Sequence, residues 1–425
     1  MRILVVGGGG REHALCWALS KTATLFCAPG NPGTRASATN LPLEVSDHQA
    51  IRDAMRAEHI DLAVIGPEIP LAAGIVDYLA AEGIPAFGPT AAAARIESSK
   101  AFAKSLMASA GVPTAASRTF TDQAEALAYI GTHAEPLVVK ASGLAAGKGA
   151  VVCSTRDGAC SAAVEMFAGK FGTAGREVVV EAFLEGEEVS IFAITDGEHV
   201  MMLPPSQDHK RLKDNDLGPN TGGMGAYSPV AFADDALLDT VESQVIGPTL
   251  AELANQGAPY RGVLYAGLMV SPTGQPWVVE FNCRFGDPEA QVVLPIVDED
   301  LTEHLWRIAS GERWSPARTR IQASGAAVTT VLAAAGYPEN PEKGAAITIP
   351  TDQPEDTILF HAGTVLDDQD TLRVSGGRVL CATGIGPDVQ TALEASRRLA
   401  AAVDFEGKVL RSDIGWREIA RAGAS

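Results

Sequence analysis

Polar side chains alternate along the end of a predicted buried strand at 277–289, in the sequence WVVEFNCRFGDPE. Glu280 and Asn282 are two residues apart, so on an extended strand both side chains leave the same face. Two oxygen-bearing groups on one face suit a hard cation such as Mg²⁺, held together with nucleotide phosphates. Arg284 continues the alternation and offers a planar fork to a carboxylate or phosphate. The intervening side chains are expected to face a core: Phe281 and Cys283. The alternative is a strand end with ordinary surface polar groups.

A glycine-rich segment between two predicted strands could bind phosphates. The strands span 137–140 and 150–153, and the segment from Ala141 to Gly149 reads ASGLAAGKG. It departs from a Walker loop, because three residues separate its first two glycines, a glycine replaces the metal-binding Ser or Thr, and a strand follows. We interpret it as a hairpin that closes over phosphates, with backbone N–H groups, Lys148 and the preceding Lys140 as donors. A flexible surface hairpin is the alternative.

The first predicted strand, Ile3–Val6, ends in four glycines, and a helix follows from about Arg11 to Ser20. A strand, a glycine turn and a helix N-terminus form a phosphate-sized anion site. The spacing disfavours a dinucleotide-binding turn, since Glu12 or His13 stands where the third glycine belongs and no acidic residue ends the second strand. We therefore expect a single phosphate here rather than NAD, with a structural tight turn as the alternative.

Strands and helices alternate over the first hundred residues. Further strands are predicted at about 25–28, 61–65 and 86–87, and helices at about 49–58 and 72–82. This alternation predicts a parallel, doubly wound sheet, which binds ligands at the carboxyl ends of its strands. Those ends, Gly7–Gly10, Pro29–Asn31 and Gly66–Glu68, could converge on one pocket. Glu68 would otherwise be an ordinary solvated loop acid.

Two segments in the middle of the chain could contact a nucleotide. The predicted strand 177–183 runs into LEGEE, where free backbone groups could pair with an adenine edge and Glu188 with a ribose hydroxyl. The loop 206–228 is poor in apolar residues and is predicted to lack regular structure. It holds Asp208 and the basic cluster His209–Lys213, which is unusual in an acidic protein. A plain turn and a solvated linker are the alternatives, and His209 by itself suits a structural role.

Composition limits the partners that this chain could have. Its 425 residues predict two to four domains. The net charge of -19 argues against a nucleic-acid or anionic-membrane partner. Six scattered cysteines lack a CxxC pair, and no apolar run has the length of a membrane span or signal peptide. We expect a soluble cytoplasmic protein, either a monomer or a weak homodimer.

The last part of the chain predicts a small α+β unit. A helix at about 300–310 precedes predicted strands at 326–333, 347–349, 357–361 and 379–383 and a helix at about 388–403. No independent catalytic constellation is evident in it. A packing and lid role is therefore expected.

Considered together, these stretches resemble the phosphoribosylamine–glycine ligase family of purine biosynthesis, within the ATP-grasp superfamily. The resemblance runs in order over nearly the whole chain. Its segments are GGGGREHAL, PGNPGT, VIGPEIPL, FGPT, ESSKAFAK, VVKASGLAAGKG, VVEAFLEGEEVS, SQDHKR, GPNTGGMGAYSP, LYAGLM, VEFNCRFGDPE, FHAGT, GGRVL and DIGW.

The resemblance implies an α/β chain with an ATP-grasp fold, an N-terminal doubly wound parallel-sheet domain and a small C-terminal α+β domain. The N-terminal domain, at 1–100, would bind phosphoribosylamine. The ATP-grasp domain would span 101–295, with its hairpin-bearing subdomain at about 115–188. A linker helix region at 296–325 would lead to the C-terminal domain at 326–425.

The implied reaction joins glycine to 5-phosphoribosylamine through glycyl phosphate, giving glycinamide ribonucleotide, ADP and phosphate. The residues expected to bind ATP are Lys100, Lys140, Gly147, Lys148, Glu181, Ala182, Leu184 and Glu188. Those expected at phosphoribosylamine are Gly9, Gly10, Arg11, Asn31 and Glu68. Arg284, Asp208 and Asp287 are candidates for the glycine side and the acyl phosphate, with Lys148 as a further catalytic candidate. Glu280 and Asn282 would hold Mg²⁺ or Mn²⁺.

Two positions depart from the family pattern. Gly8 stands where the family has asparagine, which would remove one side-chain contact to the phosphoribosyl group. Ser142 stands where the family commonly has aspartate. Three rival functions are another ATP-grasp carboxylate–amine ligase, an NAD-dependent oxidoreductase and a catalytically silent nucleotide-binding or scaffold protein. The segments SQDHKR and NCRFGDPE argue against the first, the failed dinucleotide turn against the second, and the retained Glu280, Asn282, Lys140 and Lys148 against the third.

Overall fold

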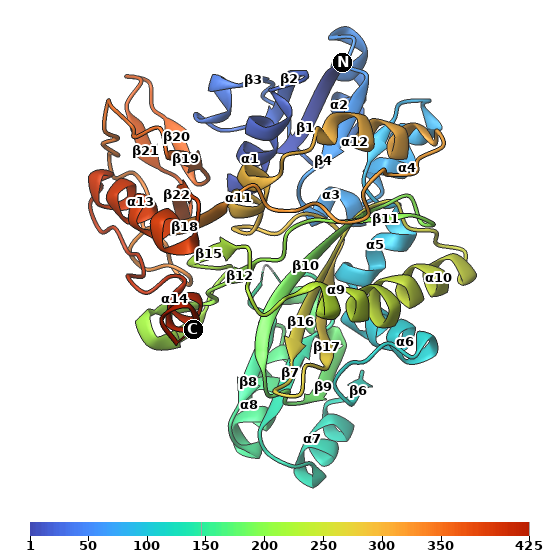
Figure 1. The fold of residues 1–425 in the computed structure, drawn as a ribbon. Helices are drawn as coiled ribbons and strands as arrows, with labels where there is room; N and C mark the ends of the chain where they lie inside the picture. Colours follow the sequence, from blue (N-terminus) through green and yellow to red (C-terminus); the bar gives the residue numbers. More distant parts are fainter. Residues whose placement is uncertain (146, 425) are drawn as a thin grey trace.

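In the computed structural model, which describes residues 1–145 and 147–424, a five-stranded parallel sheet organises the N-terminal part of the chain (Figure 1). Its strands are β1 (Arg2–Gly7), β2 (Thr24–Pro29), β3 (Ala38–Asn40), β4 (Leu62–Ile65) and β5 (Ala86–Phe87). In their order, β3-β2-β1-β4-β5, the strands β2 and β3 lie on one side of β1 and the later strands β4 and β5 on the other. This confirms the predicted doubly wound sheet.

Alternate side chains of β1 supply two separate cores, as the period of a strand requires. Ile3 and Val5 pack with α1 (Gly10–Leu19) and α12 (Leu301–Ser310), and Leu4 and Val6 pack on the opposite face. That second face is covered by α2 (His48–Ala57) and α4 (Ile75–Ala81).

The helix predicted at about 72–82 is present as α4 but begins three residues later, and a separate short helix, α3 (Glu68–Ala72), precedes it. Gly74 separates them with a left-handed backbone, at φ 83°, a conformation that glycine adopts without steric cost.

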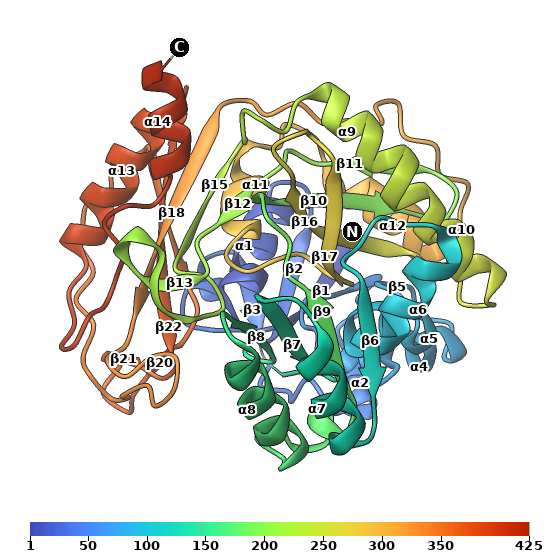
Figure 2. The same ribbon diagram turned by 90° about the horizontal axis from the view of Figure 1, so that it is seen from below.

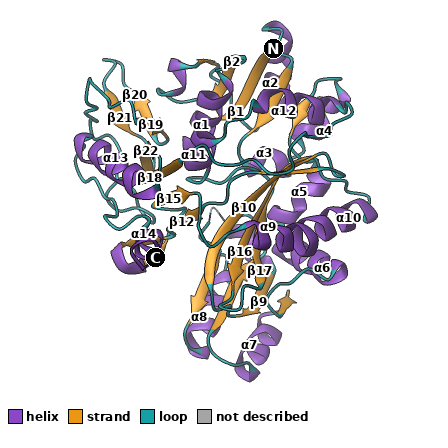
Figure 3. Ribbon diagram, in the orientation of Figure 1, coloured by secondary structure: helices purple, strands orange, loops and turns teal. Residues whose placement is uncertain are grey.

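The predicted glycine-rich hairpin lies in a four-stranded antiparallel sheet of order β6-β9-β7-β8. The strands are β6 (Ser117–Phe120), β7 (Leu137–Ala141), β8 (Ala150–Cys153) and β9 (Val178–Ala182), and its helices are α7 (Gln123–Thr132) and α8 (Arg156–Phe167). β7 and β8 pair antiparallel from Leu137–Cys153 to Lys140–Ala150, which confirms the hairpin. Ala146 within it lies outside the described residues. Figure 3 shows α7 and α8 at the end of the molecule far from the N-terminal sheet.

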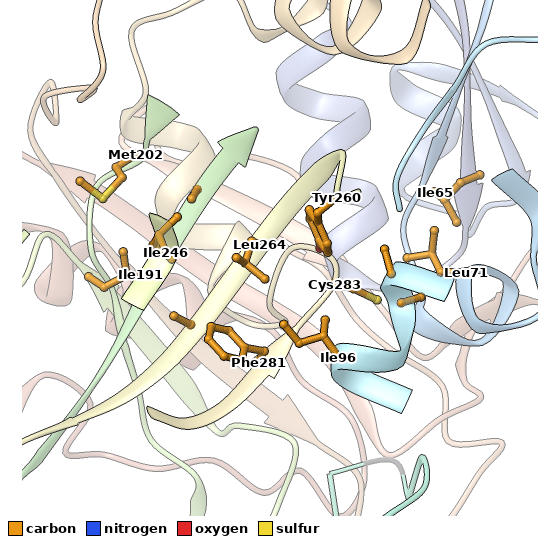
Figure 4. Packing of buried hydrophobic residues seen from close by; sticks show 14 of the residues in the cluster. Ile65, Leu71, Ile96, Ile191, Met202, Ile246, Tyr260, Leu264, Phe281 and Cys283 are labelled. Atoms are coloured by element: carbon orange, nitrogen blue, oxygen red, sulfur yellow. The ribbon is translucent and has the colours of Figure 1, made fainter. Parts of the chain in front are cut away.

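A second antiparallel sheet, of order β11-β10-β16-β17, carries the polar strand end. Its strands are β10 (Glu187–Thr195), β11 (Val200–Met202), β16 (Gly262–Val270) and β17 (Pro276–Asn282), and the helices beside it are α5 (Ala91–Ser98), α6 (Lys100–Ala110), α9 (Asp235–Val241) and α10 (Gly247–Asn255). Phe281 and Cys283 are buried, as predicted. Figure 4 shows them in a cluster with Ile96 and Leu264 that continues toward Ile65 on the N-terminal sheet.

The prediction that loop 206–228 lacks regular structure is wrong. It contains β12 (Gln207–Asp208), β13 (Arg211–Lys213), β14 (Leu217–Asn220) and β15 (Gly225–Ser228). β13 and β14 form a hairpin, whereas β12 and β15 extend the C-terminal sheet, whose order is β12-β15-β18-β22-β19. These strands are too short and polar to show the alternation of apolar and polar residues that predicts a strand. β15 also pairs with β18, which lies about a hundred residues later in the sequence.

The remaining C-terminal elements complete this sheet. They are β18 (Ala326–Ala333), β19 (Thr357–His361), β22 (Arg378–Gly386), the hairpin of β20 (Thr364–Leu366) and β21 (Leu372–Val374), and the helices α11 (Ala290–Val293), α13 (Val389–Ala402) and α14 (Trp416–Ala424). Figure 2 shows α13 beside β18 and β22 at the outer side of the molecule. The strand predicted at 347–349 is wrong, because this segment makes a single isolated bridge instead, from Thr348 to Asp404.

The segment that follows α13 is bound to the β13–β14 hairpin through Arg411, whose side chain is fully buried. Its guanidinium donates to Asp216 at 2.9 Å and to Asp413 at 2.7 and 2.9 Å. It also donates to the carbonyl of Arg211 at 3.1 Å. Residues late in the chain therefore fix the hairpin that follows Asp208.

We expect Arg411→Met to lower the free energy of unfolding by about 3 kcal/mol, because Asp413 loses its buried partner and Asp216 is left with Arg417. Urea unfolding measures the change. Arg398→Met is the matched control, since Arg398 is 54% exposed and pairs with Asp356 at the surface, where such a pair contributes at most about 1 kcal/mol. Equal losses in the two variants would contradict the prediction.

Candidate active site

A cavity of about 500 Å³ lies between the N-terminal sheet, the two antiparallel sheets and the C-terminal sheet. Most of the predicted site residues line it: Arg11, Glu68, Lys100, Lys140, Gly147, Glu181, Ala182, Leu184, Glu188, Asp208, Glu280, Asn282, Arg284 and Asp287. The others do not: Gly9, Gly10, Asn31 and Lys148. Residues from opposite ends of the chain thus meet around one space.

The end of β17 forms part of the cavity wall. Glu280, Asn282 and the following Arg284 all reach the cavity, as their two-residue spacing predicts. Arg284 donates to Asn282 at 3.2 Å and to Glu97 at 2.8 Å, and its Nε lies 3.3 Å from Glu68. Burial opposes the guanidinium charge, but Glu97 and Glu68 outweigh it and raise the pKa of Arg284 further above its usual range. Arg284 therefore remains charged and joins three separate segments.

Lysines gather on the side of the cavity nearest the glycine-rich hairpin. Lys140 and Lys104 both pair with buried Glu181, at 2.9 and 3.2 Å. Burial lowers the pKa of Lys104 to about 8, although Glu181 opposes this shift. Burial also lowers the pKa of Lys100. One carboxylate thus partly neutralises closely spaced ammonium groups, which is an arrangement suited to polyanionic phosphates.

An apolar wall lies beside the crossing from β9 to β10. Ala182, Phe183 and Leu184 line the cavity here together with Met107 and Met269. A flat apolar slot next to main-chain groups can hold a nucleobase, because the ring buries its faces while its edge meets backbone donors and acceptors.

Lys210 enters the cavity from the segment between β12 and β13. Its ammonium pairs with Glu188, and it lies 4.0 Å from Glu280 Oε1. Burial raises the pKa of Asp208, and so do neighbouring acids, Glu289 first among them. The pKa of Glu280 is lowered despite its burial, chiefly by Lys210. The cavity therefore holds an ionised Glu280 within a strongly acidic group of side chains.

Lys148 points away from the cavity. Its ammonium donates to the carbonyl of Pro338 at 2.7 Å, which joins the glycine-rich hairpin to the C-terminal part. His209 is also turned away, with 1% of its surface exposed. Its Nε2 accepts a hydrogen bond from Gly415 N–H at 3.2 Å, and burial lowers its pKa to about 3. His209 therefore has the structural role that the sequence suggested.

The first glycine turn is occupied by the protein's own side chains. Gly9 N–H donates to Glu12 at 2.7 Å. The amide of Asn31 donates to the carbonyls of Gly8 and His361, at 3.0 and 2.9 Å. The neighbouring Arg11 does reach the cavity. The turn is thus closed on itself, and of the three strand ends predicted to converge on one pocket only Gly66–Glu68 contributes cavity-lining residues, among them Glu68.

Sequence reasoning gave no site role to several residues that line the cavity: Glu97, Lys104, Tyr265, Glu289 and Arg378. Lys210 also lines it, and the sequence singled it out only as part of the basic cluster His209–Lys213. Lys104 had a detectable signal, since it follows Lys100 by four residues and so shares its helix face. Arg378 had none. It belongs to β22 and donates to the carbonyl of Asp287 at 2.6 Å, so the C-terminal sheet supplies a charged residue as well as a wall.

Comparison with known proteins agrees with this arrangement. Family models of phosphoribosylglycinamide synthetase match the chain in order, with the N domain at residues 1–97, the ATP-grasp (A) domain at 98–290 and the C domain at 327–417. A phosphoribosylamine–glycine ligase from Nostoc sp. is 47% identical, covering 98% of this chain and 99% of the relative. The chain belongs to the phosphoribosylamine–glycine ligase family. The predicted family and ligase class are confirmed.

Other relatives of this ligase family extend the comparison. The chicken trifunctional purine biosynthetic protein adenosine-3 is 49% identical over 99% of this chain, which spans 42% of that protein. A phosphoribosylamine–glycine ligase structure from Thermotoga maritima has a TM-score of 0.85 at 34% identity, covering 97% of this chain and all of that one. Biotin carboxylase from Campylobacter jejuni, with a TM-score of 0.73 at 16% identity over 96% of this chain and 92% of that one, shares the fold. The predicted ATP-grasp fold is confirmed.

The two departures from the ligase pattern have local explanations. A Cβ at Gly8 would lie 2.7 Å from the carbonyl oxygen of Gly30, so the closely packed turns suit glycine here. Ser142 Oγ accepts a hydrogen bond from Ala101 N–H at 3.1 Å, in the first turn of α6. It thus supplies an oxygen to an otherwise unpaired helix donor, as an aspartate could.

The low pKa of Lys104 predicts a pH dependence of stability. Between its pKa of about 8 and the ordinary lysine value of 10.5, the unfolded chain binds more protons, so this residue's contribution to stability rises with pH. The free energy of unfolding of the wild type, minus that of Lys104→Met, should therefore become more positive from pH 8 to 10. Urea titrations at several pH values test this, and a difference that stays flat would contradict it.

Proposed function

We propose that this chain activates glycine with ATP and transfers the glycyl group to the amine of 5-phosphoribosylamine. The observation that carries this proposal is the continuity of one cavity from the lysines and Glu280 to Arg11 and Glu68. A nucleotide and the two molecules to be joined can therefore occupy adjacent parts of the same space, as an in-line transfer requires.

The chemistry needs an activated carboxylate, because oxide is a poor leaving group. A carboxylate oxygen of glycine attacks the γ-phosphorus of ATP, forming glycyl phosphate and releasing ADP. The amine of phosphoribosylamine then attacks the carbonyl carbon, phosphate leaves, and the amine loses a proton to solvent. The protein's contribution is positioning and neutralisation of charge.

The cavity suggests a role for each group of residues. Adenine lies in the slot beside Ala182 and Leu184, the ribose near Glu188, and the phosphates near Lys100 and Lys140. The carboxylate of glycine binds near Arg284, with Asp208 and Asp287 on the same side. Phosphoribosylamine lies toward Arg11 and Glu68. Gly147, at the cavity edge, belongs to the hairpin that shields the acyl phosphate from water.

The donor set fits a metal site. Glu280 is ionised and Asn282 offers an amide oxygen on the same strand face, and Mg²⁺ is commonly held by one or two such groups together with phosphates. Among the described residues, no cluster of three or more His, Cys, Asp and Glu side chains forms a metal site without a nucleotide. We assign Mg²⁺ or Mn²⁺ to Glu280 and Asn282. When bound, the ion neutralises charge on phosphate oxygens.

We also propose a cytoplasmic setting, domain boundaries near residues 100, 295 and 325, and a monomer or weak homodimer. The six cysteines are free in the structure, which suits a reducing compartment. No helix among residues 1–145 and 147–424 could cross a membrane.

The proposed reaction is tested by ADP release with Mg²⁺-ATP. We expect sustained ADP release, beyond one equivalent per protein, only when both glycine and freshly generated phosphoribosylamine are present, since the acyl phosphate must be consumed before the next turnover. Alanine in place of glycine tests the size of the acceptor pocket. ADP release that does not depend on glycine, or does not depend on phosphoribosylamine, would overturn the substrate assignment. The chain would then be a ligase for another carboxylate and amine.

The metal assignment is tested by Glu280→Gln, which keeps the shape and removes the charge. We expect turnover to fall about 100-fold or more, because one lost group that stabilises charge typically has this effect. Glu165→Gln is the control, since Glu165 is exposed on α8 and pairs with Lys170 at the surface. Full turnover in Glu280→Gln would remove Glu280 from the metal site.

A further inference from the structure

Lys210 lies at the centre of an acidic group of side chains that faces the cavity. The carboxylates of Glu188, Asp208, Glu280 and Glu289 line the same space. The Lys210 ammonium pairs with Glu188 and lies 4.0 Å from Glu280 Oε1. This one lysine therefore bridges the residue assigned to the ribose and the residue assigned to the metal.

These contacts compete with the roles proposed for Glu188 and Glu280 when a nucleotide is bound. A carboxylate that holds a ribose hydroxyl or a divalent ion has to turn its oxygens toward that ligand. A second cation about 4 Å from the same carboxylate would repel the ion and weaken its binding in this partly buried site. Movement of Lys210 away from Glu280 would therefore favour metal binding there.

The structure allows the side chain to move while its main chain stays fixed. Thr221 N–H and Thr221 Oγ1 both donate to the carbonyl of Lys210, at 2.7 and 2.9 Å. The preceding His209 is buried and bound to Gly415. Only the flexible four-carbon stem separates the ammonium from this fixed anchor, so rotation about its bonds suffices to exchange partners.

We propose that Lys210 is a resident counter-ion, which neutralises Glu188 and Glu280 in the free protein and is displaced by the metal–nucleotide complex. This inference rests on the proposed function for the identity of the metal site. It assigns Lys210 two states: paired with the carboxylates before binding, and released toward the phosphates afterwards. The pairing keeps an acidic cavity from collecting divalent ions without a nucleotide.

The test measures Mn²⁺ binding without nucleotide, from the electron paramagnetic resonance signal of free Mn²⁺. We expect Lys210→Met to bind Mn²⁺ roughly 10-fold more tightly than wild type, because the ion no longer competes with a bound ammonium. A gain in affinity that depends on Glu280 distinguishes this effect from misfolding. Lys210→Arg keeps the charge and should retain weak binding.

Lys213→Met is the matched control, since it makes the same charge change on the exposed β13 of the same segment. Equal Mn²⁺ affinity in Lys210→Met and Lys213→Met would overturn the proposal, because net charge alone would then explain any gain in affinity. Adding Glu280→Gln to Lys210→Met should abolish the gain. A gain that persists would place the ion elsewhere and would overturn it as well.

A further arm with ADP separates this inference from the proposed function. Mn²⁺ binding that requires ADP and Glu280, but is no tighter without nucleotide in Lys210→Met, leaves the metal assignment standing and overturns the counter-ion role. Binding that is insensitive to Glu280 even with ADP overturns both. Tighter binding in Lys210→Met that depends on Glu280 supports both.

Discussion

The ion pairs of Arg284 hold together the parts that surround the cavity. Arg284 follows β17, Glu97 belongs to α5, and Glu68 begins α3 at the carboxyl edge of the N-terminal sheet. Because these pairs are largely buried, loss of one partner would leave an uncompensated charge. The geometry of the cavity thus depends on electrostatic contacts at the point where its separate sheets meet, while the apolar clusters stabilise each sheet from behind.

A balance between burial and opposite charge explains the protonation of the cavity. Burial lowers the pKa of Lys104 and raises that of Asp208, whereas nearby lysines keep Glu280 ionised. Groups of both signs are therefore held close to one another before any ligand arrives. An environment fixed in advance stabilises developing charge with little reorganisation, which is how enzymes gain most from electrostatics.

Much of the fold and part of the site could be predicted from local patterns. The two-residue period of β17 predicted both the cavity-facing Glu280 and the buried Phe281, and glycine spacing distinguished the β7–β8 hairpin from a Walker loop. Contacts between distant segments could not be predicted in this way. Lys148 bonds to Pro338, and Asn31 bonds to His361, so both residues are turned from the cavity by partners far along the chain.

The same limit applies to the segment that carries Asp208. Its strands are two to four residues long and polar. β12 and β15 are strands only because they pair with each other and with β18 in the C-terminal sheet. The family resemblance identified segments of which most reach the cavity. It carried no information on which side chains already bind one another, and that information decides which residues are available to a ligand.

The ion pairs and hydrogen bonds of Arg411 have a consequence for the synthesis of the chain. Arg411 and Asp413 follow every residue that lines the cavity, the last of which is Arg378. During translation, the two antiparallel sheets can therefore assemble before Arg411 is available to bind the β13–β14 hairpin beside Lys210. The contacts of Arg411 that hold the β13–β14 hairpin can therefore form only after every residue of the cavity wall has been synthesised.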